Sequence, residues 1–226
     1  MFKQNNVLNL IVVGVGFATA FLVASVLQSL DTESELKEWP RFADGKRVFP
    51  DIQLTTHEGE TVAFYTDLIE NRQAFVYFIY TRCTGTCVPS TKNLVQVQKL
   101  LKENTDEEVL FIAITLDPEH DDPTVLKEYR ERHGIRDDWV FLTGDVREIN
   151  QLRRNIGFFD FDLEVDSDKS EHAALVAYGN DKTGAWGAAP ALLPPEQIAS
   201  AALLLMTDFS ERQSEVAMRG PVSRNN

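Results

Sequence analysis

The longest apolar stretch of the chain lies at its N-terminus, where residues 10–27 contain no charged side chain. A transmembrane helix needs about 20 mostly apolar residues, so residues 1–30 are predicted to form one membrane-spanning anchor. Lys3 precedes the stretch and acidic residues follow it, which places the N-terminus in the cytoplasm by the positive-inside rule. A cleaved signal peptide is the alternative, but apolar sequence continues past the small residues at 18–20.

The rest of the chain is therefore predicted to lie outside the cytoplasm, as a periplasmic domain held by a single-pass anchor in the inner (cytoplasmic) membrane. Residues 31–48 are polar and lack apolar periodicity, which favours a tether. Residues 49–207 alternate apolar runs with amphipathic ones and are predicted to form the globular domain. Residues 208–226 are predicted to be a flexible tail.

Apolar runs rich in β-branched and aromatic residues predict buried strands in this domain. A shorter pair of alternating segments precedes them, with a turn at Glu58 and Gly59, and this pattern is typical of a β-hairpin. The predicted buried strands are residues 74–80, 109–116, 139–144 and 172–179.

Amphipathic segments between these runs predict helices. The clearest has Asp122 as N-cap, Pro123 at the first helical position and Gly134 just past its end. A second has Asp145 as its cap and four apolar residues predicted to share one face. These four are Val146, Ile149, Leu152 and Ile156.

Two further helices are predicted, one starting at Pro89 and Ser90 and one over residues 196–206. The Gly- and Pro-rich residues 183–195 are predicted to be irregular, either a partner-binding loop or a simple connection. Strands alternating with helices predict an α/β sandwich. An opening β-hairpin followed by βαβ units, with cysteines at the first strand-to-helix junction, is typical of a thioredoxin-like fold with an N-terminal extension.

The chain is acidic, with a formal net charge of -13. Such a surface repels nucleic acid and suits cationic partners or metal ions, and the sequence has no nucleic-acid-binding motif. The simplest interpretation of the charge is that it keeps the domain soluble.

The chain has two cysteines, Cys83 and Cys87, at the predicted junction. Backbone N–H groups at a helix N-terminus stabilise a thiolate, which both redox exchange and metal binding require. A structural disulfide is the least favoured interpretation, because closing so small a loop removes little chain entropy. A redox couple and a site for a thiophilic ion such as Cu(I) both stay open.

A metal site would need further ligands, and the chain has four histidines. We interpret His57 as a solvated turn residue, His120 as a surface residue in an acidic loop, and His133 as an imidazolium at a helix C-terminus. His172 immediately precedes the last predicted strand. On the residues alone, a strand-edge role for His172 is favoured over a ligand role.

Four segments together resemble the Sco/SenC family in order and spacing, over about residues 49–205: "VYFIYTRCTGTC", "AITLDPEHDDPTVLKEYRERHG", "WVFLTGD" and "EHAALVAYG". Members of that family are membrane-anchored copper proteins with a thioredoxin-like fold, and they assist assembly of cytochrome c oxidase. The resemblance implies one copper ion per chain, as Cu(I) or Cu(II), held by Cys83, Cys87 and His172. It thus reverses the interpretation of His172. For Asp117 it implies contact with the ligands without binding the metal itself, or a role in shaping the loop.

The resemblance also implies a function and its partners. A metallochaperone would deliver copper to the receiving subunit of a cytochrome oxidase, with other periplasmic copper or thiol-redox proteins as further partners. The alternative is a thiol–disulfide oxidoreductase in which Cys83 and Cys87 form the redox-active pair and keep the oxidase's copper-site cysteines reduced. A peroxidase of the same fold is less favoured, because a peroxidatic signature is missing. Whether the chain is an enzyme therefore stays open.

The sequence departs from the family pattern beside its ligands. Thr84 and Val88 stand where members often carry proline after each cysteine, and Pro89 comes one residue later. Glu171 and Ala173 flank the histidine where aspartate and serine or threonine are usual. The three ligands are retained while their surroundings change, as expected of a divergent paralogue with its own partner and redox tuning.

Overall fold

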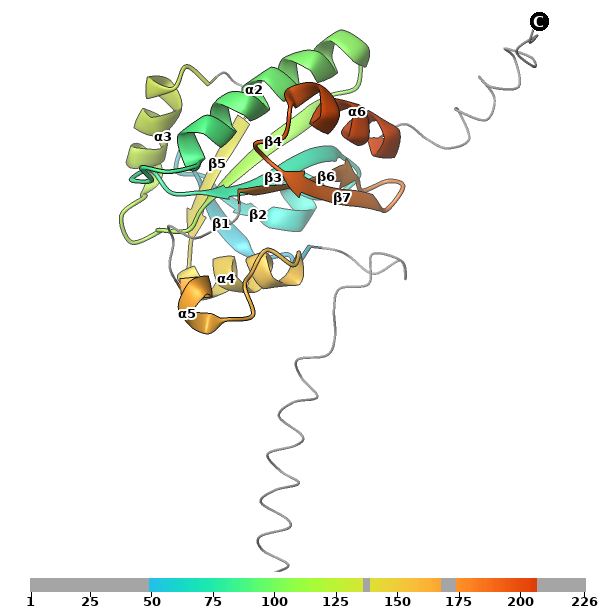
Figure 1. Cartoon of the computed structure of the whole chain (residues 1–226). Helices are drawn as coiled ribbons and strands as arrows, with labels where there is room; N and C mark the ends of the chain where they lie inside the picture. The colour runs from blue at the N-terminus through green and yellow to red at the C-terminus, as the bar shows by residue number, and fades with distance from the viewer. Residues whose placement is uncertain (1–48, 136–138, 168–173, 207–226) are drawn as a thin grey trace, which may run out of the picture. The chain divides into compact units, whose positions relative to one another are not determined.

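The structure is a computed structural model that describes residues 49–135, 139–167 and 174–206. Within these residues seven strands form one sheet in the order β2-β1-β5-β4-β3-β6-β7 (Figure 1). Strand β3 pairs in parallel with β4, and β4 with β5, whereas β6 runs antiparallel to β3. The strands are β1 (Gln53–Thr56), β2 (Thr61–Ala63), β3 (Gln73–Ile79), β4 (Val109–Thr115), β5 (Trp139–Gly144), β6 (Leu175–Asn180) and β7 (Ala185–Pro190).

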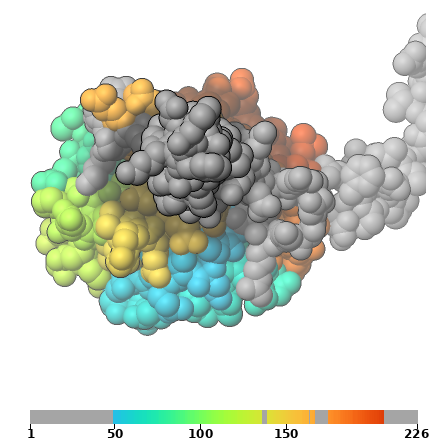
Figure 2. All heavy atoms as spheres, turned by 90° about the horizontal axis from the view of Figure 1, so that it is seen from below, coloured from blue at the N-terminus to red at the C-terminus, as the bar shows by residue number. Residues whose placement is uncertain are grey.

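Helices cover both faces of the sheet (Figure 1). Helices α2 (Cys87–Asn104), α3 (Pro123–Arg132) and α6 (Pro195–Met206) lie on one face. The other face carries α4 (Val146–Asn155), the short α5 (Leu163–Ser167) and a π-helical turn, Phe64–Ile69. Figure 2 views this second face, where α4 lies beside the β1–β2 hairpin.

Each face has its own hydrophobic core. Under α2 and α3 the rings of Phe111 and Trp139 stack on neighbouring strands, with their centroids 4.9 Å apart, and Phe75 stacks on Phe111 at 4.6 Å. Strands β3 and β4 are buried on both faces, so nearly every residue in them is apolar. The three-layer arrangement confirms the α/β prediction, and the β3–α2–β4 unit with its flanking antiparallel strands is thioredoxin-like.

The predicted helix caps are confirmed. The Asp122 carboxylate accepts a hydrogen bond from the N–H of Val125 at 2.9 Å, and Pro123 is the first residue of α3. Gly134 follows that helix with φ of 63°, a conformation that glycine adopts without strain. Asp145 caps α4 by accepting from two backbone N–H groups.

Three local predictions were wrong. Part of the stretch 183–195 is regular, because β7 pairs antiparallel along the whole of β6. Val146 is 43% exposed, since it is the first residue of α4 and the core contact starts one turn later at Ile149. Helix α2 starts at Cys87 rather than at Pro89, so one cysteine belongs to the helix itself.

Within the part of the chain that the structure describes, no helix is both long and apolar enough to cross a bilayer. The predicted anchor at 1–30, tether at 31–48 and tail at 208–226 all fall outside the described residues. They stay predictions.

Candidate thiol and metal site

The two cysteines lie where the central strand β3 passes into α2. The sheet is extended just past β3, since the N–H of Leu116 donates to the carbonyl of Ile79 at 2.7 Å. The chain then turns, with the N–H of Cys83 donating to the carbonyl of Tyr80 at 3.2 Å. Cys83 therefore sits in the connecting loop and Cys87 at the first position of α2, so both lie at the strand-to-helix junction that the sequence predicted, although the helix starts two residues earlier than expected.

Both thiols are free and line one small cavity of about 30 Å³. Ala174 and Leu175, at the start of β6, line the same cavity. Phe158, which follows α4, also contributes to its wall. Segments from three distant parts of the chain thus meet at the cysteine pair, and the space is enough for about one water molecule or a single ion.

The two thiols have different acidities. Burial acts to raise the pKa of the Cys83 thiol, but hydrogen bonds from the Cys87 thiol and from the backbone N–H groups of Cys87 and Gly85 outweigh it and lower that pKa. Burial, together with the hydrogen bond to Cys83, raises the pKa of the Cys87 thiol. Of the two thiols, Cys83 therefore loses its proton first as the pH rises.

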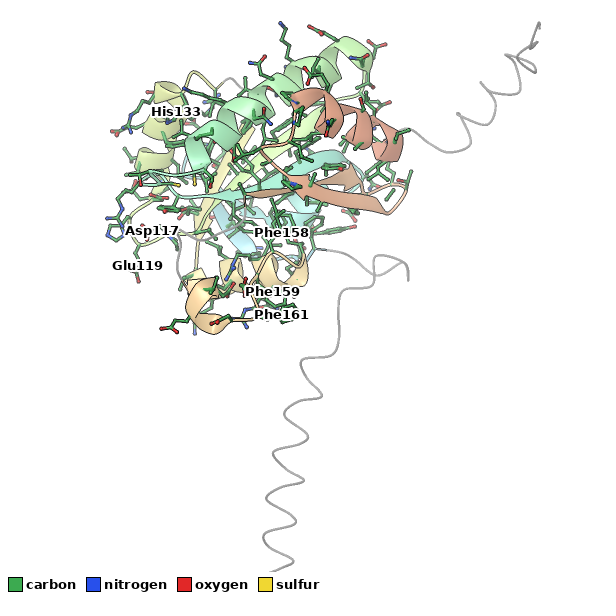
Figure 3. The ribbon with its side chains drawn as sticks, viewed as in Figure 1. Asp117, Glu119, His133, Phe158, Phe159 and Phe161 are labelled. Carbon is green, nitrogen blue, oxygen red and sulfur yellow. The ribbon has the colours of Figure 1, made fainter. Side chains whose placement is uncertain are left out.

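Asp117 lies beneath the cysteine loop rather than on a sulfur atom. Its side chain is buried, and it accepts a hydrogen bond from Arg82 Nη2 at 2.7 Å, while His120 Nδ1 lies 3.1 Å from its other oxygen. Figure 3 shows Asp117 beside Glu119 in the loop between β4 and α3. Arg82 stands next to Cys83 in the sequence, so Asp117 ties the cysteine loop to the β4–α3 loop. This contact supports a loop-shaping role for Asp117.

The histidine interpretations need revision at two positions. His57 is buried, not solvated, because the hairpin turn packs against β5 and the N–H of Phe141 donates to His57 Nδ1 at 3.3 Å. His133 is the C-cap residue of α3, as expected, but burial and the nearby Arg132 lower its pKa and oppose the imidazolium form. His120 has a half-exposed side chain, in agreement with a surface position.

Among the described residues, no group of three or more His, Cys, Asp and Glu side chains is arranged to hold a metal ion. The predicted ligand His172 falls in residues 168–173, outside the described part of the chain. Ala174, two residues after His172, lines the cysteine cavity. The structure thus brings Cys83 and Cys87 together and brings the chain next to His172 to the same place.

Sequence reasoning missed two neighbours of the thiols. Arg82 was not singled out, although it lies between the strand and Cys83 and forms the ion pair with Asp117. Tyr80 also went unnoticed, and its hydroxyl hydrogen-bonds to the Cys83 sulfur and helps to lower the pKa of that thiol. Both contacts depend on how the loop folds, so residue type and spacing carried no signal for them.

Known proteins share this sequence pattern. A SCO2-like protein of Rickettsia felis is 26% identical over 127 residues, which are 56% of this chain and 60% of that relative. The match thus spans less than two thirds of that relative's length. A SCO2-like protein of Rickettsia prowazekii, RP031, is 27% identical over 172 residues, covering 74% of this chain and 85% of the relative.

Solved structures share the fold. The crystal structure of Arabidopsis thaliana ScoI with copper bound superposes with a TM-score of 0.57 at 17% identity, covering 74% of this chain and 99% of that one. BsSco, described as having a disulfide switch and as a member of the Sco family of cytochrome c oxidase assembly proteins, gives a TM-score of 0.57 at 22% identity, covering 70% and 93%. At these identities the likeness establishes the fold.

The fold and the site together define a thioredoxin-like protein with a free dithiol at the junction of its central strand and the following helix. A model of the SCO1/SenC family matches residues 41–205, and the chain belongs to that family.

Proposed function

We propose that this chain is a copper metallochaperone that delivers one copper ion to a cytochrome oxidase during assembly. Cys83, Cys87 and His172 are the proposed ligands. The observation that carries the proposal is the shared cavity: both thiols and Ala174, two residues beyond His172, line it. Two residues span at most about 7 Å, so the length of chain between Ala174 and His172 is compatible with a ligand role for that imidazole.

The donor set suits copper. Thiolates are soft ligands that favour Cu(I), and an imidazole also accommodates Cu(II). Cys83 supplies a thiolate readily because its pKa is lowered, whereas Cys87 must lose its proton as the ion binds. Delivery proceeds by ligand exchange, in which the acceptor's ligands replace those of the donor one at a time. The copper-bound relative ScoI and the oxidase-assembly role given for BsSco support this assignment.

The location follows from the predicted anchor. We propose that the domain of residues 49–207 lies on the periplasmic side of the inner membrane, held by residues 1–30 through the tether 31–48. The receiving site of the oxidase would then be reached from that side. Labelling of the Cys83 thiol in intact cells by a membrane-impermeant maleimide would support this topology, and protection of that thiol until lysis would overturn it.

The test is a copper titration of the full-length chain in mild detergent, fully reduced and anaerobic. We expect one copper per chain, and with Cu(II) a thiolate-to-copper charge-transfer band that His172→Ala loses. His120→Ala, a half-exposed histidine in the next loop, is the matched control and should retain the band. Retention of full copper binding in His172→Ala, with loss in Cys83→Ser and Cys87→Ser, would contradict the three-ligand site.

A second function is favoured by the unequal thiols, and it is a thiol–disulfide oxidoreductase acting on the oxidase's copper-site cysteines. The Cys83 thiolate would attack the partner's disulfide, form a mixed disulfide and release one partner thiolate. Cys87 would then attack the Cys83 sulfur, release the second partner thiol and leave a Cys83–Cys87 disulfide. This two-electron exchange does not need His172. Full biological rescue by His172→Ala would therefore favour it over copper delivery.

A further inference from the structure

A buried carboxylate holds the start of the cysteine loop. Asp121, between β4 and α3, has 0% of its surface exposed. Its Oδ2 accepts from the N–H of Thr81 at 3.0 Å and from the Thr115 hydroxyl at 2.5 Å, and its Oδ1 accepts from the Thr81 hydroxyl at 2.5 Å. A buried carboxylate is costly unless such donors satisfy its oxygens, so all three bonds matter.

Two other contacts of the same loop are weaker. Arg82 donates to Asp117, but its side chain is 60% exposed, and an ion pair with one exposed partner contributes little. The turn bond from Cys83 to the carbonyl of Tyr80 is long, at 3.2 Å. Of these three contacts of the loop, the one between Asp121 and Thr81 is therefore the firmest.

This contact lies where it can fix the position of the Cys83 sulfur relative to that of Cys87. Strand β3 ends at Ile79, and Thr81 is the point at which the chain has left the sheet, two residues before Cys83. Cys87 is fixed separately, as the first residue of α2. The separation of the two thiols thus depends on how Thr81 is held, and Asp121 holds both its backbone N–H and its hydroxyl.

We propose that Asp121 is a positioning residue that sets the separation of Cys83 and Cys87 by anchoring Thr81. The inference rests on the proposed function, because both ligand exchange and thiol–disulfide exchange need two sulfur atoms held at a fixed separation. The hydrogen bonds of Asp121 go to Thr81 and Thr115, so it positions the loop through its backbone, and its charge adds to burial in raising the pKa of the Cys87 thiol.

The measurement is the equilibrium between dithiol and disulfide in glutathione buffer, made on the full-length chain in mild detergent without copper. Oxidation of Cys83 and Cys87 to one disulfide converts one glutathione disulfide into two glutathione thiols. Asp121→Asn keeps the shape of the side chain but turns one acceptor into a donor that faces donors. We expect the equilibrium constant for disulfide formation to fall by about tenfold, as for a lost hydrogen bond to a charged group.

Asp122→Asn is the matched control, because it removes the same charge one residue away. Its side chain caps α3 through Val125 and does not contact the loop, so the equilibrium constant should stay within about twofold of the wild type. An equal shift in both variants, no shift in Asp121→Asn, or a rise instead of a fall would each overturn the proposal.

A second pair of variants keeps the Asp121 carboxylate, so it tests the route through Thr81 apart from the charge of Asp121, and it also serves if Asp121→Asn does not fold. Thr81→Val removes the hydroxyl and should lower the equilibrium constant in the same direction. Thr81→Ser keeps the hydroxyl and the N–H and should restore the wild-type value, whereas equal values for the two variants would contradict the route. The readout needs no copper. Failure of the wild-type chain to bind copper, with these shifts in the variants still observed, would therefore count against the proposed function alone.

Discussion

Arg153 and Asp166 form a bidentate ion pair, with Nη1 and Nη2 lying 2.6 and 2.7 Å from the two carboxylate oxygens. Arg153 Nη1 also donates to the carbonyl of Phe158 at 3.0 Å. Both charged side chains are buried, and Arg153 and Phe158 line the cysteine cavity. This ion pair therefore fixes the segment after α4 that forms one wall of the site.

Breaking the pair on one side is expected to destabilise the domain. Asp166→Asn should lower the free energy of unfolding by about 3 kcal/mol, because it leaves the Arg153 charge buried without its partner. The double variant Arg153→Met with Asp166→Leu should recover most of that loss, since two apolar side chains do not need to be desolvated as ions. Urea unfolding of the three proteins at pH 7 checks this, and additive losses in the double variant would contradict it.

The same pair predicts stability at low pH. The hydrogen bonds from Arg153 hold the pKa of the Asp166 carboxyl below its usual range. A lowered pKa in the folded state means that this stabilisation is complete above about pH 4, the value for an unfolded aspartate, and is lost as the pH falls through the folded pKa. Asp166→Asn should therefore flatten the fall of unfolding free energy below pH 4, measured by urea titration. An unchanged slope would contradict the assignment.

The buried His57 leads us to expect a second change of stability, between pH 7 and 5. Burial, followed by the nearby positive charge of Arg130, lowers its pKa, with Glu58 acting in the opposite direction and Lys127 in the same one. Below pH about 6.5 the unfolded chain therefore binds a proton that the folded chain resists. The free energy of unfolding should decrease as the pH falls from 7 to 5.

His57→Gln should remove most of that decrease, because its side-chain oxygen can still accept from the N–H of Phe141 without gaining a charge. His133→Gln is the comparison, since burial also lowers the pKa of His133, although that side chain is less buried. Urea unfolding at pH 5 and 7 gives the slopes. A slope that is unchanged in His57→Gln but lost in His133→Gln would show that His133, and not His57, causes the decrease.

The close packing of β7 against β6 leaves no room for a side chain at Gly179. A Cβ at this position would lie 2.7 Å from the Trp186 ring and closer still to the Ala185 carbonyl. Gly179→Ala is expected to reduce the free energy of unfolding by about 2 kcal/mol, because the ring and the strand must move apart. Gly85→Ala is the control, since its Cβ would meet only the Cys83 sulfur at 4.0 Å. Equal stability of the two variants would contradict the β6–β7 pairing.

How far the sequence predicted the structure depends on whether the determining contacts are local. Helix α3 was predicted with its cap and its end because Asp122, Pro123 and Gly134 act on their own neighbours. Strand β7 was missed because its small residues become regular only by pairing with β6. The burial of His57 was missed for the same reason, since it depends on Phe141, far away in the sequence.

The candidate site divides in the same way. The positions of Cys83 and Cys87 followed from the strand and helix patterns around them, and the ligand role of His172 came from the family resemblance and remains a prediction. The difference between the two thiols was not predictable, because it arises from burial and from hydrogen bonds within one folded loop. The contacts by which Asp117 and Asp121 hold that loop could not be predicted from the sequence either, because they form only when the two loops fold together.

The unequal thiols lead to a prediction about their reactivity. A lowered pKa gives Cys83 more thiolate at neutral pH, and the thiolate is the species that reacts with alkylating agents. Cys87 is more buried and holds its proton. Iodoacetamide at pH 7 should therefore modify Cys83 at least about tenfold faster than Cys87, which corresponds to about one pKa unit. Peptide mass spectrometry of partly modified protein gives both rates.

Two variants of Cys87 identify the cause. Cys87→Ser retains a side-chain donor to the Cys83 sulfur, whereas Cys87→Ala removes it and leaves only backbone donors. The rate of Cys83 alkylation should rise with pH at a higher midpoint in Cys87→Ala than in Cys87→Ser, because the pKa of Cys83 loses one of the hydrogen bonds that lower it. Coincident rate–pH profiles would show that the backbone N–H groups of Gly85 and of residue 87 lower the pKa without help from the second thiol.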